Sequence, residues 1–134
     1  MSRPPGNLGL HHVALQVCDL EACEHFYVDL LGMNVEWRPD ADNLYLTSGQ
    51  DNLALHRVVE DPAPSEQQRL DHLGFILSNP ESVDQWHDFL SGHGVTVVKS
   101  LRTHRDGARS FYCMDPAGNT VQMIYHPPIA DRLR

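Results

Sequence analysis

The chain repeats one pattern twice, and this repetition limits the fold more than any other feature. Residues 8–17 (LGLHHVALQV) alternate between the two faces expected of a half-buried strand. Asp19 can then cap a helix that Gly32 ends. Three short β-rich runs follow, at 35–38, 44–47 and 52–58. The first repeat is therefore predicted to be β-α-β-β-β.

A second copy of this pattern starts roughly sixty residues later. Residues 70–78 (LDHLGFILS) alternate again, Asn79 and Pro80 begin a helix, and β-rich runs follow at 96–101, 109–114 and 120–126. We predict a single α+β domain, residues 1–134, with repeats at about 8–59 and 69–127 and a Pro-rich linker at 60–68. The eight strands are expected to form one curved, mostly antiparallel sheet, a half-barrel with the helices outside.

Alternation in the two leading strands predicts where two histidines point. Val13, Leu15 and Val17 should pack on the first helix, which turns His12 to the opposite face of the sheet. The same argument, made on 73–77, turns His72 away from the second helix. Equivalent residues of the two repeats would then meet on a shared concave surface.

Composition excludes several classes of partner. Eighteen acidic and ten basic residues give a net charge of −8, without a basic stripe, so neither nucleic acid nor an anionic membrane is expected. No apolar run is long enough to span a membrane or to serve as a signal peptide, and three cysteines without a CxxC pair suggest reduced thiols in a cytoplasm. Nine histidines are unusually many for 134 residues and require an explanation.

Three segments resemble the vicinal oxygen chelate superfamily, which includes glyoxalase I, extradiol dioxygenases, fosfomycin-resistance enzymes and bleomycin-binding proteins. They are HHVALQVCDLEACEHFYVDLLGM, LDHLGFIL and SFYCMDPAGNTVQMI, and the likeness extends over roughly 8–127. The resemblance implies a small-molecule ligand and a homodimer. It leaves open whether each site is built within one chain or across two.

In metal-dependent members of this superfamily, the ligands come from the first and last strands of each repeat. The resemblance carries those positions onto His12, His56, His72 and Gln122, and alternation places all four on the concave face. One divalent ion is implied, and Fe, Zn, Mn, Ni and Co all suit imidazole ligands. Gln122 stands where related enzymes usually have Glu. Its amide can ligate through oxygen but cannot accept a proton.

Four further residues are candidates for contact with a substrate. His104 and Tyr112 could act as catalytic acid or base, Arg109 could bind a carboxylate or phosphate, and Tyr45 could line the substrate site.

We therefore expect a metal-dependent enzyme, either a glyoxalase-like lyase or isomerase or an extradiol-type dioxygenase. In either case the ion would chelate substrate oxygens for deprotonation or oxygen insertion. The alternatives are a non-catalytic binding protein of the bleomycin-resistance kind and an enzyme that transfers a thiol to an epoxide. A metal-free protein would favour the binding module.

Overall fold

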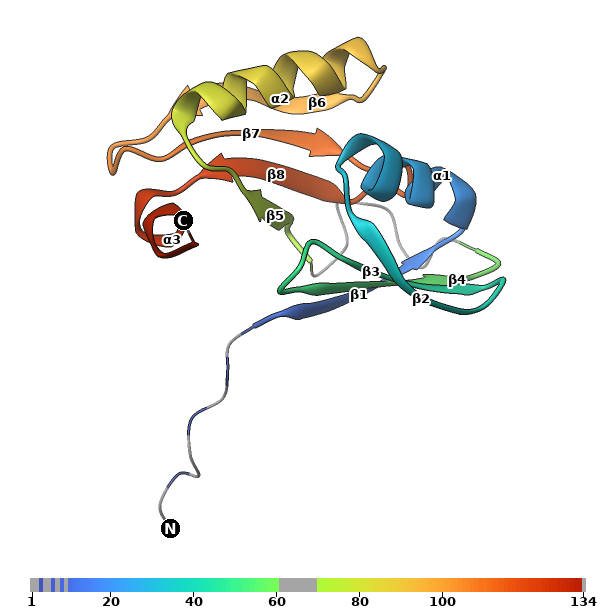
Figure 1. Ribbon diagram of the computed structural model, residues 1–134. Helices are drawn as coiled ribbons and strands as arrows, with labels where there is room; N and C mark the ends of the chain where they lie inside the picture. The colour runs from blue at the N-terminus through green and yellow to red at the C-terminus, as the bar shows by residue number, and fades with distance from the viewer. Residues whose placement is uncertain (1–2, 4–5, 7, 9, 61–69, 134) are drawn as a thin grey trace. The chain divides into compact units, whose positions relative to one another are not determined.

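A computed structural model describes residues 3, 6, 8, 10–60 and 70–133 (Figure 1). The chain divides into two compact units, residues 1–60 and 61–134, called here the first and second units. The predicted linker at 60–68 lies, apart from residue 60, outside the described residues.

The first unit is a four-stranded sheet with a helix on one face. Its elements in chain order are β1 (His12–Val17), α1 (Leu20–Glu24), the π-helical η1 (His25–Leu30), β2 (Asn34–Asp40), β3 (Asn43–Thr47) and β4 (Asn52–Arg57). The strand order is β1-β4-β3-β2, with β1 parallel to β4 and the other pairs antiparallel. Asp19 caps α1 as predicted, because its Oδ1 accepts a hydrogen bond from the backbone N–H of Ala22 at 3.0 Å.

Alternation in the first unit agrees with the prediction. Leu15 and Val17 of β1 are buried, whereas His12, Ala14 and Gln16 are exposed. The helix, the residues after it and the strands supply the other buried side chains: Leu20, Cys23, Phe26, Tyr27, Leu30, Met33, Leu44, Leu46, Leu53, Ala54 and Leu55. Ala54 is buried although its parity is that of His56. Each fully buried leucine stabilises the fold by about 1.5–3 kcal/mol. This core fixes which face of the sheet His12 occupies.

The second unit repeats the same topology. It contains β5 (Leu73–Ile76), α2 (Pro80–Gly92), β6 (Val97–Thr103), β7 (Arg109–Met114), β8 (Thr120–Tyr125) and α3 (Pro127–Leu133). The strand order is β5-β8-β7-β6, again with the first and last strands parallel, and α2 packs on β6, β7 and β8. Asn79 caps α2 through its Oδ1, which accepts from the N–H of Ser82 at 2.8 Å.

The α+β class and the two βαβββ repeats are confirmed, with two differences. The strands form two four-stranded sheets rather than one sheet of eight, because the last strand of each repeat pairs with the first strand of the same repeat. The sequence also did not predict α3, which begins at Pro127. Proline is compatible with the first turn of a helix, where its missing N–H costs nothing, although it usually signals a break.

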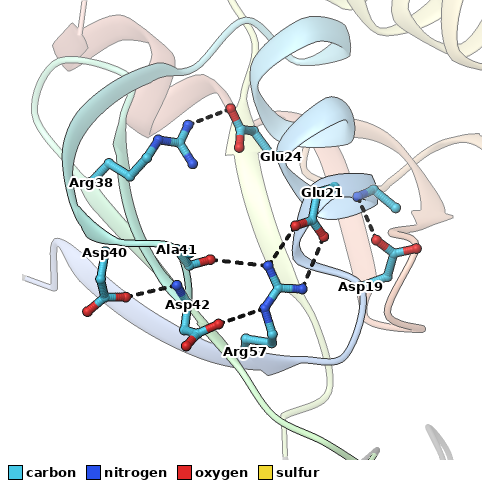
Figure 2. A network of polar contacts seen from close by, with 9 residues as sticks. Asp19, Glu21, Glu24, Arg38, Asp40, Ala41, Asp42 and Arg57 are labelled. Carbon is cyan, nitrogen blue, oxygen red and sulfur yellow. Dashed lines mark hydrogen bonds and ion pairs between the residues drawn. The ribbon is translucent and has the colours of Figure 1, made fainter.

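A charged network ties the helix of the first unit to its sheet (Figure 2). Arg57 of β4 contacts Glu21 of α1 at 2.6 Å and Asp42, between β2 and β3, at 3.0 Å. Arg38 contacts Glu24 at 2.7 Å. The hydrogen bond from Arg57 lowers the pKa of Glu21 to about 2. These side chains are engaged with one another on the helix side, away from the face that carries His12.

Candidate metal and substrate site

Matching registers in the two units identify which residues are equivalent. In the first unit Ala14 lies opposite Ala54, and Tyr45 lies on the other side of Ala54. In the second unit Gly74 and Tyr112 flank Gln122 in the same way. His12 stands two residues before Ala14, and His72 stands two residues before Gly74. The equivalent pairs are therefore His12 with His72, Tyr45 with Tyr112, and Ala54 with Gln122.

His56 does not occupy the place in the first unit that Gln122 has in the second. It lies opposite Gln16, whereas His12 lies opposite Asn52, so the two histidines are four register positions apart on one sheet face. Four residues of a strand span about 13 Å. Side chains stand roughly perpendicular to a sheet, and two ligands of one ion lie within about 4 Å of each other. This register does not bring His12 and His56 together.

His12 belongs to a chain of three polar side chains. Its Nδ1 lies 2.6 Å from Oδ1 of Asn52, the residue paired with it on β4. The amide of Asn52 in turn donates from Nδ2 to Oε1 of Glu36 at 2.9 Å. Since Nδ2 is the donor toward Glu36, Oδ1 must be the acceptor toward His12, and the proton of the neutral imidazole lies on Nδ1. Nε2 of His12 then carries a lone pair.

His56 is held by a second chain of the same kind. Its Nδ1 lies 2.6 Å from Oδ1 of Asn43 on β3, and the Asn43 amide donates from Nδ2 to the carboxylate of Asp40 at 2.9 and 3.1 Å. Asp40 also accepts from the N–H of Asp42 at 2.8 Å (Figure 2), and these hydrogen bonds lower the pKa of its carboxyl group. The ring of His56 meets that of Tyr45 edge to face at 5.9 Å, and Tyr45 stacks on Trp37 at 5.2 Å.

The second unit brings three of the predicted site residues together. The ring of His72 meets that of Tyr112 edge to face at 5.2 Å, and Nε2 of Gln122 donates to the Tyr112 hydroxyl at 3.0 Å. Gln122 is only 9% exposed, and its Oε1 would lie 3.7 Å from a Cβ at Gly74 on the neighbouring strand. In this orientation of the amide, Oε1 is an acceptor on the side of β5. Nζ of Lys99 lies over the ring of Tyr112, 5.2 Å from its centroid.

The fit of these donors to a metal ion rests on their protonation. His72 resembles His12, since its Nδ1 lies 2.6 Å from Oδ2 of Asp71, which as a carboxylate can only accept. Metal-binding histidines commonly donate one ring N–H to such an acceptor and ligate through the other nitrogen. His12, His72 and the Oε1 of Gln122 are therefore suitable donors. Among the described residues, no three His, Cys, Asp or Glu side chains lie close enough together to hold a metal ion. Convergence of the two units on one ion stays a prediction.

His104, which follows β6, contacts a residue on the face of β7 that carries Tyr112. Its Nε2 lies 3.1 Å from Oγ of the buried Ser110, and Ser110 and Tyr112 share one face of β7 by alternation. Ser110 and Tyr112 are about 7 Å apart along the strand. His104 therefore contacts the residue two positions before Tyr112 on that face.

Arg109 lies on the opposite face of β7. Its Nε and Nη2 donate to Oδ1 of Asp84 on α2, at 2.9 and 2.7 Å, and its Nη1 donates to Thr103 at 2.8 Å. Odd-numbered residues of β7 face the helix, as the contact between Phe111 and His87 also shows. This placement separates Arg109 from Tyr112. Binding of a substrate anion by Arg109 stays a prediction, and in the structure its guanidinium is engaged with Asp84 and Thr103.

The aspartate of the DPAGN segment holds the turn that sets this register. Asp115 is buried, and its Oδ1 accepts from the N–H of Ala117 and of Asn119, at 2.9 and 2.8 Å. Gly118, with φ of 89°, adopts the left-handed conformation that the turn requires. The turn aligns β7 with β8 so that Tyr112 faces Gln122.

Sequence reasoning missed the residues that support the histidines. Asn52 and Asn43 are ordinary strand-end polar residues in the sequence, and their partners Glu36 and Asp40 are contributed by β2. The register of β2 shifts between Val35 and Trp37 and again between Trp37 and Asp40. Such bulges turn side chains to a face that strict alternation does not give them. Only the pairing of the strands reveals these contacts.

The two βαβββ units, each with its first and last strands parallel, define the fold class of the protein. A sequence model of the Glyoxalase/Bleomycin resistance protein/Dioxygenase superfamily matches residues 9–123. The chain therefore belongs to this superfamily.

Comparison with individual proteins gives distant relatives of several activities. The chain is 27% identical to "Metallothiol transferase FosB" of Staphylococcus epidermidis, over 85% of this chain and 79% of that protein. It is 31% identical to "1,2-dihydroxynaphthalene dioxygenase" of Sphingobium xenophagum, over 84% of this chain but only 39% of that protein. A crystal structure of a glyoxalase/dioxygenase from Nostoc punctiforme has a TM-score of 0.77 at 24% identity, covering 95% of this chain and 97% of its own. That similarity supports the fold.

Helices in the described part of the chain are too short or too polar to cross a membrane.

Proposed function

We propose that the protein is a metal-dependent enzyme acting on a small oxygen-bearing molecule, with His12, His72 and Gln122 as ligands of one divalent ion. One observation supports this proposal most strongly. Histidines at equivalent positions of the two units each have Nδ1 bonded to an acceptor oxygen, at 2.6 Å in both, so both present Nε2 as a lone pair. The same kind of Nδ1 contact also occurs at His25, His87 and His93, which belong to helices or follow one. The support therefore comes from the contact together with the equivalent positions of His12 and His72, each two residues before the matched strand pair.

The second unit supplies groups suited to a reaction. A bound ion would polarise substrate oxygens as a Lewis acid. The Tyr112 hydroxyl accepts a hydrogen bond from Gln122, so its own proton is available for a substrate oxygen that gains negative charge. Gln122 has no proton to exchange. His104, which contacts Ser110 on the face of β7 that carries Tyr112, is therefore the proposed acid or base.

We propose that His56 contacts the substrate and is not a fourth ligand of the ion. The sequence placed it among the ligands, but it lies about 13 Å along the sheet from His12. Its Nδ1 is bonded to Asn43, and its ring lies beside Tyr45. His56 and Tyr45 together present a hydrogen-bond acceptor and an aromatic edge to the part of the substrate distant from the ion.

Metal analysis tests the proposal and selects the reaction. Protein purified without chelator and without a histidine tag should contain close to one equivalent of metal, and His56→Ala should retain it. Iron would direct assays to oxygen uptake with catechol-type substrates, which is the dioxygenase reaction. Zinc, nickel or cobalt would direct them to isomerisation of hemithioacetals, which is the glyoxalase reaction. Protein that binds none of these ions, even after reconstitution, would refute the proposal and favour a non-catalytic binding protein.

A further inference from the structure

The most informative arrangement outside the proposed ligands is the chain of side chains behind His12. It runs from Glu36 on β2 through Asn52 on β4 to His12 on β1, with 2.9 Å between Glu36 and Asn52 and 2.6 Å between Asn52 and His12. The three residues come from three different strands of one sheet. Each contact joins a donor to an acceptor, and the carboxylate at its end can only accept.

An amide between a carboxylate and an imidazole determines the imidazole tautomer only if the amide cannot turn. Asn52 alone could present either Oδ1 or Nδ2 to His12. Glu36 removes this freedom, because a turned amide would direct its oxygen at the carboxylate and lose a charge-assisted hydrogen bond. With the amide fixed, its oxygen selects the tautomer that has a proton on Nδ1.

The position of Glu36 depends on an irregularity of β2. Val35 pairs with Leu46 and Trp37 with Tyr45, so Glu36 is an extra residue without a counterpart on β3. A bulge of this kind can place two consecutive side chains on one face of a sheet. This explains how Glu36 reaches Asn52 across β3.

We propose that Asn52, anchored by Glu36, is a positioning residue that holds His12 in the Nδ1–H tautomer and keeps Nε2 as the nitrogen that meets the ligand. That this ligand is a metal ion rests on the proposed function. The tautomer of His12 rests only on its hydrogen bond to Asn52 and on the contact of Asn52 with Glu36. Outer contacts of this kind typically change metal affinity by about 10–100-fold when they are removed. The role is indirect, since Asn52 acts only through His12.

The second chain, from Asp40 through Asn43 to His56, provides a matched control. It has the same chemistry and the same 2.6 Å contact to Nδ1, but it acts on a different histidine of the same sheet. Asn52→Ala should therefore affect His12 and spare His56, and Asn43→Ala should do the reverse. A general disturbance of the sheet would affect both histidines in both variants.

The test is a measurement of imidazole tautomers by ¹⁵N NMR in metal-free, full-length protein at about pH 9, where imidazoles are neutral. Protonated and lone-pair ring nitrogens have well separated ¹⁵N shifts. His12 should be almost entirely Nδ1–H in the wild type and a mixture in Asn52→Ala. Glu36→Ala should shift it toward Nε2–H, because the freed amide can then offer Nδ2 to Nδ1. Asn52→Asp, which keeps an acceptor oxygen, should restore Nδ1–H.

A second readout links the tautomer to binding. Zn²⁺ affinity, measured by competition with a chelator, should fall by about 10–100-fold in Asn52→Ala and stay unchanged in Asn43→Ala. The amide spectrum of each variant establishes that it is folded. An unchanged His12 tautomer in Asn52→Ala, or an equal change in Asn43→Ala, would overturn the proposal. A wild type with the expected tautomer but no Zn²⁺ binding would refute only the metal-dependent function.

Discussion

Replacing Tyr112 by Phe should destabilise the protein through Gln122. The substitution removes the hydroxyl that accepts the 3.0 Å hydrogen bond from Nε2 of Gln122, whose side chain is 9% exposed. A buried donor left without a partner costs about 1–3 kcal/mol of unfolding free energy. Unfolding entropy for 134 residues is about 0.28 kcal/mol/K, so the midpoint of thermal unfolding should fall by about 4–11 °C.

The equivalent tyrosine of the first unit is the control. Tyr45 occupies the matching register position, opposite Ala54, and among the described residues its side chain makes ring contacts with Trp37 and His56. Tyr45→Phe should therefore change stability by no more than about 0.5 kcal/mol. Urea denaturation of both variants, followed by circular dichroism, measures the difference. Equal losses in the two variants, or no loss in Tyr112→Phe, would show that Gln122 is not held as described.

Three further predictions concern charge, capping and thiol reactivity. Because its pKa in the folded protein is depressed to about 2, Glu21 contributes stability that is fully present above its ordinary pKa of 4.5 and is lost as the pH falls toward 2. Glu21→Gln should thus be less stable than wild type in denaturant titrations at pH 7 and equal to it near pH 2, and added salt should reduce the difference. Asn79→Ala removes the cap of α2 and should cost about 0.5–2 kcal/mol by urea denaturation, whereas Asn79→Asp should cost little. Burial raises the pKa of Cys113 to about 12, so mass spectrometry should find it unmodified by iodoacetamide at pH 8 until the protein unfolds; rapid labelling of the native protein would contradict its burial.

Sequence periodicity predicted the faces of the strands because apolar residues recur at every second position of a strand that is buried on one face. Val17 and Leu55 had to face the helix, so His12 and His56 had to face away from it, and the structure agrees. The helix caps Asp19 and Asn79 could also be predicted from the sequence, because a capping side chain accepts a hydrogen bond from a backbone N–H only three residues further on.

Periodicity could not determine register along the strands. Residues 52, 54 and 56 all satisfy the same alternation, and only the pairing of β1 with β4 shows that Ala54, and not His56, matches Gln122. The contact of Glu36 with Asn52 was equally hidden, since it depends on a bulge in β2. Arg109 and Tyr112 are three positions apart on β7, so alternation puts their side chains on opposite faces of the strand. The sequence alone already indicates this separation.

The most direct test of the account compares metal content in two double variants. His12→Ala with His72→Ala removes the proposed ligands from both units, whereas His25→Ala with His93→Ala removes two exposed histidines whose ring nitrogens bond to Asp29 and to the backbone oxygen of Phe89. Elemental analysis after equilibration with one divalent ion should find near-stoichiometric metal in the wild type and in the second variant, and almost none in the first. Equal metal in both variants would contradict the proposed site.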